Sequence, residues 1–189
     1  MLNISIISGT DRPGSLSLQL AGFIKQKYED ETVKASIASM EDFPLTQVVG
    51  GKYGEKIADV EAFISPILQA DGWVIIIPEY NGSFPGILKM FIDYLPYPGG
   101  FQDKPVAFIG EGDGAFGGLR AVEHMQMVAG YRQAYTFPQR VFVQRVRKNF
   151  DQKDGITDPL IDSLLDEQVK GFIKFIRQLS GSMDAAVKS

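Results

Sequence analysis

The sequence of 189 residues contains no cysteine and a single histidine, His124. The absence of cysteine excludes disulfide bonds, thiolate metal ligands and thiol nucleophiles. With one histidine we expect no zinc site, although an all-carboxylate magnesium site stays open. No nucleophile-elbow motif accompanies His124, which falls in an expected helix, so we do not expect a Ser-His-Asp triad. We interpret His124 as a surface or interface residue and expect no metal ligands.

Long apolar runs and a strong charge imbalance are also missing. No apolar run approaches the roughly 20 residues that span a bilayer, and the first residues, MLNISIISGT, lack the features of a secretory signal. The formal net charge of -4 gives only weak repulsion from nucleic acid and anionic membranes. We expect a cytoplasmic protein that binds neither nucleic acid nor membrane.

The composition is that of an ordinary folded protein. Hydrophobic residues make up 44% and charged residues 22% of the chain, values near the average for globular domains. A chain of this length buries enough apolar surface to fold without disulfides or metals. We see no internal repeat, linker or low-complexity segment, and expect residues 1–189 to form a single domain.

Strand and helix patterns alternate along the chain. Short apolar or β-branched runs predict strands at 2–7, 33–37, 73–77, 106–109 and 141–146. Apolar residues at helical spacing predict helices over 16–28, 57–68, 85–95, 117–129 and 161–176. The alternation predicts an α/β fold with a five-stranded parallel sheet covered on both faces, in the order 2-1-3-4-5. A ligand then binds at the carboxyl ends of the strands.

The turn after the first strand, SGTDRPGS, has the composition of an anion site. It offers backbone and side-chain groups at the start of a helix: Gly9, Thr10, Arg12, Gly14, Ser15 and Ser17. A helix start with glycines and one arginine fits a phosphate monoester. The turn matches neither the Walker pattern nor the dinucleotide fingerprint. The alternative is an ordinary strand-to-helix turn with a capping hydroxyl and a solvated arginine.

Related segments follow the third and fourth strands, and together the three segments resemble a known family. SGTDRPGS, PEYNGSFPGILKMFIDYL and KPVAFIGEGDGAFGGLRA are similar in order and spacing to the signature segments of NADPH-dependent FMN reductases, a family that includes quinone and chromate reductases. The resemblance covers residues 1–145 and is most specific in the middle segment. It implies a flavodoxin-like three-layer sandwich that binds FMN.

The resemblance also implies which residues hold the flavin. The residues that would bind the phosphate are Gly9, Thr10, Arg12, Ser15 and Ser17. Those that would contact the isoalloxazine ring are Pro78, Glu79, Tyr80 and Asn81. A flat ring needs an apolar or aromatic surface and a few placed donors, which a loop after a buried strand can present. The alternatives are a partly buried surface aromatic at Tyr80 and a plain turn pair at Asn81 and Gly82.

The third segment departs from the family pattern. Glu111, Gly112, Asp113 and Gly114 stand where the family usually carries small hydroxyl residues ahead of its glycines. If both carboxylates lie near the flavin, we expect them to destabilise the reduced, negatively charged flavin and lower its reduction potential. The alternative is a solvated acidic turn whose glycines supply N–H donors. A second departure is Ser17, where the family often has Asn.

The activity that the resemblance implies is electron transfer from NADPH or NADH through FMN to a small-molecule acceptor such as a flavin or quinone. No side chain need act as an acid or base, and we expect ping-pong kinetics. The resemblance also implies a homodimer or homotetramer through the 117–129 helix and the helix that starts near Pro85. In the 117–129 helix, Met125 and Met127 are expected as core residues or, alternatively, interface residues. Two other readings stay open: a flavodoxin-type electron carrier and a cofactor-free scaffold.

Overall fold

A parallel sheet forms the centre of the molecule. The structure is a computed structural model that describes the backbone of residues 1–187 and the side chains of residues 1–181. The strands are β1 (Asn3–Ser8), β2 (Lys34–Ser39), β3 (Gly72–Pro78), β4 (Pro105–Gly112), β5 (Tyr135–Thr136) and β6 (Val141–Gln144). They pair in parallel in the order β2-β1-β3-β4, and both β5 and β6 pair with β4. The predicted flavodoxin-like strand order is confirmed.

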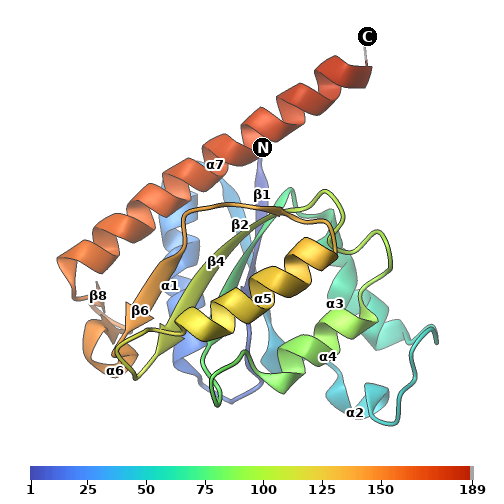
Figure 1. Cartoon of the computed structure of the whole chain (residues 1–189), viewed down its shortest axis with the longest axis horizontal. Coiled ribbons are helices and arrows are strands. Elements are labelled where there is room, and N and C mark those ends of the chain that lie inside the picture. The colour runs from blue at the N-terminus through green and yellow to red at the C-terminus, as the bar shows by residue number, and fades with distance from the viewer. Residues whose placement is uncertain (188–189) are drawn as a thin grey trace.

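Helices cover both faces of this sheet (Figure 1). On one face lie α1 (Leu16–Asp30) and α7 (Pro159–Val187), and on the other lie α3 (Ala58–Gln69), α4 (Gly86–Tyr94) and α5 (Leu119–Tyr131). Shorter elements complete the described chain: η1 (Met40–Asp42), α2 (Leu45–Val48), α6 (Val146–Asn149) and the antiparallel pair β7 (Phe150–Asp151) and β8 (Gly155–Ile156). The result is the expected three-layer sandwich.

The two hydrophobic cores follow from the alternation of side chains along the strands. In β3, Val74 and Ile76 pack under α1 and α7, while Trp73, Ile75 and Ile77 pack under α3, α4 and α5. All of these side chains are buried. A continuous apolar run is typical of a central strand that is covered on both faces, and this is the position the sequence predicts for 73–77.

The fifth position of the sheet is divided between two short strands, so the predicted single strand over 141–146 is wrong in its bounds. Pro138 has no N–H to donate to β4, and the strand is interrupted there. The side-chain amide of Gln168, from α7, donates instead to the Phe108 carbonyl at 3.0 Å and to the Gln139 carbonyl at 2.9 Å. Strand β6 ends at Gln144, and α6 begins at Val146.

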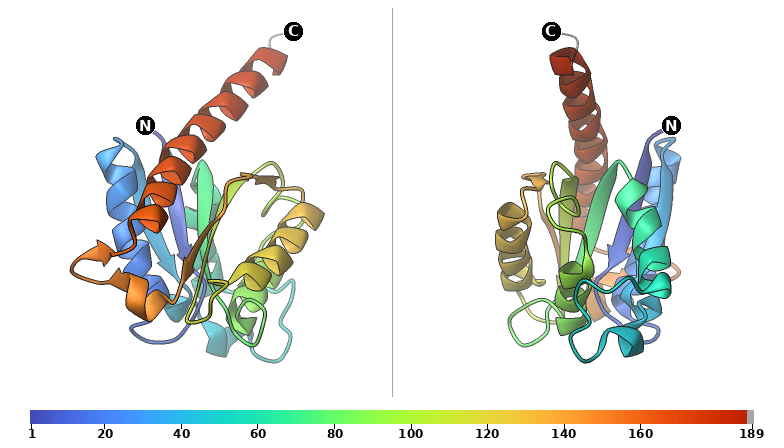
Figure 2. Two further views of the ribbon diagram at one scale, coloured as in Figure 1. Left: turned by 60° about the vertical axis from the view of Figure 1, so that its left-hand side comes forward. Right: turned by 90° about the vertical axis from the view of Figure 1, so that its right-hand side faces the viewer.

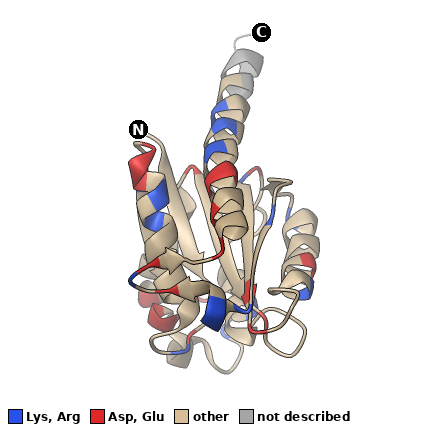
Figure 3. Ribbon diagram, turned by 90° about the vertical axis from the view of Figure 1, so that its left-hand side faces the viewer, with Lys and Arg blue, Asp and Glu red and all other residues tan. Residues whose placement is uncertain are grey.

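The outer helices α1 and α7 are joined by a half-buried lysine. Lys27 Nζ lies 2.8 Å from Asp162 Oδ1 and 2.6 Å from Asp166 Oδ1. Burial alone lowers the pKa of Lys27, but the hydrogen bonds to both carboxylates outweigh it and raise the pKa. Acidic residues gather at the start of α7 and basic residues follow further along it (Figure 3). The C-terminal part of α7 extends beyond the sheet (Figure 2).

The sheet register brings the three predicted segments to one edge. Ser8 of β1 pairs with Ile76 of β3, and Pro78 of β3 pairs with Glu111 of β4. The turns that leave these strands therefore start side by side at the carboxyl ends, where α/β folds of this topology bind ligands. Within the described residues, no helix is long and apolar enough to cross a membrane.

Candidate functional site

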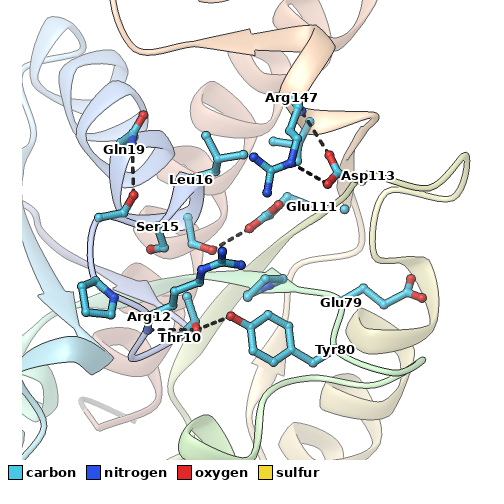
Figure 4. Close-up of a pocket in the computed structure, with 16 residues that line it drawn as sticks. Thr10, Arg12, Ser15, Leu16, Gln19, Glu79, Tyr80, Glu111, Asp113 and Arg147 are labelled. Atoms are coloured by element: carbon cyan, nitrogen blue, oxygen red, sulfur yellow. Dashed lines mark hydrogen bonds and ion pairs between the residues drawn. The ribbon is translucent and has the colours of Figure 1, made fainter.

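A cavity of about 380 Å³ opens at the carboxyl ends of β1, β3 and β4 (Figure 4). This volume is within the range of small-molecule sites, about 300–1,000 Å³. The predicted residues that line it are Thr10, Arg12, Ser15, Ser17, Pro78, Glu79, Tyr80, Glu111, Gly112 and Asp113. The structure therefore brings most of the predicted site residues, from all three segments, around a single cavity.

The first wall of the cavity is the start of α1. Ser15 is the N-cap: its Oγ accepts a hydrogen bond from the Leu18 N–H at 3.1 Å. As first-turn residues, Leu16 and Ser17 have N–H groups without an acceptor inside the helix. Because Ser15, Leu16 and Ser17 all line the cavity, this end of it has the free N–H donors and the positive helix dipole that favour an anion. The Ser15 hydroxyl therefore caps α1, and the free N–H groups of the same turn can still bind an anion.

Arg12 adds a full positive charge to the same wall. Its side chain lines the cavity and forms no ion pair with the side chains that the structure describes. Gly14, two residues further on, has φ of +61°, a conformation that favours glycine. An unpaired guanidinium beside free helix N–H groups is a phosphate-binding arrangement.

The second wall is the segment after β3. The Tyr80 hydroxyl lies 2.8 Å from Thr10 Oγ1, and the Thr10 Oγ1 also accepts the Arg12 N–H at 3.3 Å. Thr10 is buried, whereas Tyr80 is 40% exposed and presents its ring to the cavity. This wall combines an apolar surface from Pro78 and an aromatic ring, which suits a flat conjugated ligand.

The residues after Tyr80 form a tight turn. The Tyr80 N–H donates to the Ser83 carbonyl at 2.8 Å, and the Ser83 N–H donates to the Tyr80 carbonyl at 3.1 Å. The central residues, Asn81 and Gly82, have φ of +52° and +79°, as a two-residue hairpin turn requires. Asn81 does not line the cavity, so its structural role is the turn, and its predicted contact with the ring stays a prediction.

The third wall holds a buried carboxyl group. Glu111 is only 6% exposed, and the Ser17 hydroxyl donates to its Oε1 at 2.6 Å. Burial raises the pKa of Glu111; the nearby Asp113 adds to this rise, and the Ser17 hydrogen bond and Arg147 oppose it. Two of the positions at which the sequence departs from the family pattern, Ser17 and Glu111, are therefore in direct contact.

Asp113 behaves differently from Glu111. The Arg147 Nε donates to Asp113 Oδ2 at 2.8 Å, and both side chains are largely exposed. Asp113 therefore lines the cavity as a carboxylate whose charge Arg147 partly balances. Arg147 was not among the residues predicted from the sequence, although it follows the carboxyl end of the fifth strand position, where this topology places ligand contacts.

Predicted site residues that lie away from this cavity are Gly9 and Gly114, in addition to Asn81. Gly9 has a separate reason to be glycine: a Cβ there would lie 2.6 Å from the Ile76 carbonyl oxygen, and its N–H donates to that oxygen at 3.0 Å. The backbone of Gly9 thus packs closely against β3, where a side chain would not fit. The Gly114 carbonyl accepts the Arg145 N–H at 3.1 Å, which joins the third segment to α6.

Two further sets of residues that the sequence singles out lie elsewhere in the fold. Among the described residues, no three or more His, Asp or Glu side chains gather as they would to hold a metal ion. The His124 Nδ1 is 3.0 Å from the Ser83 Oγ in an exposed position, outside the cavity. Met125 is buried in the core as expected, but Met127 is 67% exposed, so its interpretation as a core residue is wrong. It faces solvent because it follows Met125 by two positions on a helix.

Comparisons with known proteins identify the family of the chain. A sequence model of NADPH-dependent FMN reductases matches residues 2–147. A 2-hydroxy-1,4-benzoquinone reductase from a Burkholderia species is 35% identical over 69% of this chain and 71% of its own. A quinone reductase from Escherichia coli K12 is 30% identical over 94% of this chain and 97% of its own.

A solved structure shares the fold. The flavoenzyme NAD(P)H:(acceptor) oxidoreductase FerB from Paracoccus denitrificans aligns with a TM-score of 0.77 and 21% identity, covering 94% of this chain and 98% of its own. The family match covers all three segments that line the cavity. The chain belongs to the family of NADPH-dependent FMN reductases.

Proposed function

We propose that this protein binds FMN in the cavity, oxidises NADPH or NADH, and reduces a small quinone-type acceptor. Membership of the family makes FMN-dependent NAD(P)H oxidoreduction its activity. The observation that supports the location is the pairing, in one cavity of about 380 Å³, of an anion-binding helix start with an apolar aromatic wall. FMN carries a phosphate at one end and a flat ring at the other, which matches these two walls.

The α1 wall would hold the phosphate. Hydrogen-bond donors come from the N–H groups of Leu16 and Ser17. Positive charge comes from the Arg12 guanidinium, which forms no ion pair with the described side chains. The Ser15 hydroxyl is occupied as the helix cap and the Ser17 hydroxyl by Glu111. Backbone groups and Arg12 therefore carry most of the proposed phosphate contacts, and the hydroxyls keep the turn in shape.

The segment after β3 would hold the ring. Pro78 and Tyr80 provide apolar and aromatic contact, and the Thr10 hydrogen bond fixes the Tyr80 ring against the first wall. When bound, FMN supplies the hydride-accepting chemistry. The protein places and orients the ring, and no acid or base from the described residues is needed at the reacting atoms.

The names of the relatives support the choice of acceptor. Both are called quinone reductases, one of them with a hydroxybenzoquinone in its name. A quinone is flat, like the flavin ring, and suits the same open side of the cavity as the nicotinamide. We therefore expect the donor and the acceptor to bind in turn, which gives ping-pong kinetics with parallel lines in initial-rate plots.

The decisive test is the visible spectrum of the purified protein with and without NADPH under anaerobic conditions. The proposal expects a flavin spectrum that NADPH bleaches and a quinone restores. A yellow protein whose colour NADPH and NADH leave unchanged would indicate a flavodoxin-type carrier. A colourless protein that does not take up added FMN would overturn the proposal and indicate a scaffold.

We also propose that a second copy of the chain packs against α4 and α5. A groove of about 510 Å³ lies between these helices, and its rim carries Met127 and Tyr131, which are 67% and 76% exposed. Exposed large apolar side chains beside a groove are typical of an interface. The family resemblance assigns dimer or tetramer contacts to the same helices.

The assembly is tested by light scattering during size-exclusion chromatography. Met127→Glu should shift a dimer or tetramer toward monomer by placing a charge in the interface. Leu160→Glu is the matched control, because Leu160 is 68% exposed on α7, on the other face of the sheet. Equal effects of the two substitutions, or a monomeric parent protein, would contradict the proposal.

Finally, we propose that residues 1–189 act as a single domain in the cytoplasm. The packing of α7 on the same sheet as the three site segments supports one folding unit. The need for NAD(P)H, an intracellular electron donor, supports the compartment. A single cooperative unfolding transition and co-fractionation with cytoplasmic enzymes are the expected results.

A further inference from the structure

Glu111 is an unusual residue for a wall of an anion site. The residue is buried, with an exposed fraction of 6%. Its side chain accepts a hydrogen bond from the Ser17 hydroxyl at 2.6 Å, and Ser17 belongs to the first turn of α1, where the anion would bind. A negative carboxylate would therefore lie one side chain away from a negative phosphate, inside a poorly solvated wall.

Other charged groups around Glu111 do not remove this conflict. Asp113 on the same loop is negative and raises the pKa of Glu111 further, whereas Arg147 from α6 lowers it. Arg147 is already paired with Asp113 at 2.8 Å. From the remaining walls, Arg12 and Glu79 line the same cavity with opposite charges. Burial remains the largest influence on the carboxyl group and favours its neutral form.

We propose that Glu111 takes up a proton from solvent when the phosphate of FMN binds, so that the cavity holds the phosphate beside a neutral carboxylic acid. This inference rests on the proposed function, because it requires FMN phosphate at the start of α1. The carboxylate gains a proton and no other bond changes. Ser17 still donates to the carbonyl oxygen of the acid, so the contact between α1 and β4 survives protonation.

The proposal has a thermodynamic consequence. If binding favours the protonated form of Glu111, then by linkage the affinity for FMN must fall as the pH rises through the titration range of this group. Each unit by which the phosphate raises the pKa of Glu111 weakens binding by about tenfold at high pH. The phosphate itself has a second ionisation near pH 6 that acts in the opposite sense, so variants must be compared at the same pH.

The experiment measures proton uptake directly. The full chain is freed of flavin, and the enthalpy of FMN binding is measured by calorimetry in buffers of different ionisation enthalpy, from about pH 5 to about pH 9. The slope against buffer enthalpy gives the number of protons taken up. We expect the wild-type protein to take up a proton that Glu111→Gln does not, and Glu111→Gln to bind FMN at least about tenfold more tightly near the high-pH limit.

Glu123→Gln is the matched control. It removes the same charge by the same substitution from an exposed residue of α5 that does not line the cavity. It should keep the proton uptake of the wild type. If Glu111→Gln takes up the same number of protons as the wild type at every pH, the proposal is wrong.

Riboflavin, which has the ring without the phosphate, identifies the group that Glu111 senses. Its binding should show no difference in proton uptake between the wild type and Glu111→Gln. A difference as large as that for FMN would assign the proton to the ring and overturn the role of the phosphate.

Ser17→Ala supplies a second variant. The Ser17 hydrogen bond lowers the pKa of Glu111, so its removal raises that pKa in the flavin-free protein. At low pH more of the Glu111 is then protonated before FMN binds, and the proton uptake on binding should be smaller than in the wild type.

These outcomes separate the inference from the proposed function. A protein that binds no FMN in any form overturns the proposed function, and the proton inference with it. A protein that binds FMN and is reduced by NADPH, but whose proton uptake does not depend on Glu111, overturns the inference alone.

Discussion

The Tyr80 hydroxyl and the Thr10 Oγ1 lie 2.8 Å apart, although 70 residues separate them in the sequence. This hydrogen bond joins the two walls to which we assign the phosphate and the ring. Figure 4 shows this bond between Thr10, which follows β1, and Tyr80, which follows β3, in the lining of the cavity. The orientation of the Tyr80 ring is therefore set by the same turn that would bind the phosphate.

Tyr80→Phe should weaken FMN binding by about fivefold, which corresponds to the loss of roughly 1 kcal/mol for one hydrogen bond. Thr10 keeps the Arg12 N–H as a donor at 3.3 Å, so the fold should tolerate the change. Flavin fluorescence titration measures the affinity. A double-mutant cycle with Thr10→Val tests the pair, and additive losses would show that the two hydroxyls are not coupled.

Ser15 should contribute to stability more than to ligand binding. Ser15→Ala removes the cap of α1 and should lower the free energy of unfolding by about 1 kcal/mol. Ser15→Asn preserves a capping oxygen and should stay within a few tenths of a kcal/mol of the wild type. Urea denaturation of the flavin-free protein measures both. If Ser15→Asn is as unstable as Ser15→Ala, the cap is not the reason.

Arg12 should contribute to phosphate affinity alone. Arg12→Gln should weaken FMN binding by about tenfold to a hundredfold, because a charge-assisted hydrogen bond contributes roughly 1.5–3 kcal/mol. Stability should hardly change, since Arg12 is exposed and its side chain has no ion pair with the described side chains. Riboflavin provides the control ligand, and an equal loss of riboflavin affinity would contradict this role.

Much of the fold could be predicted from the sequence because each buried strand has a local signature. The run from Trp73 to Ile77 is apolar throughout, as a strand covered on both faces must be. The division of the fifth position had no such signature. It depends on Pro138 and on the Gln168 amide, which reaches the Phe108 carbonyl from 60 residues away. Long-range side-chain partners of this kind are not encoded in local periodicity.

The site shows the same limit. The composition of the turn from Gly9 to Ser15 predicts an anion site through the helix start alone. The sequence around Glu111 and Asp113 does not indicate whether these side chains face the cavity or solvent. The structure separates them, because the partner of Glu111 is Ser17 and the partner of Asp113 is Arg147. Both partners lie on other elements, so only the fold could reveal the difference.

The Asp113 and Arg147 pair should tune the flavin potential. Arg147→Gln leaves Asp113 without its partner, and the added negative charge at the cavity wall should lower the midpoint potential by about 10–20 mV, as expected for an exposed pair. Asp113→Asn should raise it by a similar amount. Lys148→Gln removes a neighbouring exposed charge that does not line the cavity and should have little effect. Shifts of the same sign in Arg147→Gln and Asp113→Asn would contradict the argument.

Glu111 should make the flavin-free protein less stable as the pH rises. Burial raises the folded-state pKa of this group above its usual value of 4.5. Below that value Glu111 is protonated in both the folded and the unfolded chain, so its charge does not lower the free energy of unfolding. Between the unfolded and the folded pKa the unfolded chain releases the proton first, so the folded state loses stability.

Glu111→Gln removes this loss while it keeps an acceptor for the Ser17 hydroxyl. Near neutral pH it should raise the unfolding midpoint by about 2–4 °C. For a chain of this size this shift corresponds to a gain of roughly 1 kcal/mol in the free energy of unfolding, which is the order of the cost of burying a polar group. At about pH 4 the variant and the wild type should be equally stable. Thermal unfolding followed by circular dichroism at both pH values measures the difference. A variant that is less stable than the wild type at neutral pH would mean that the charged Glu111 stabilises the fold, contrary to the burial argument.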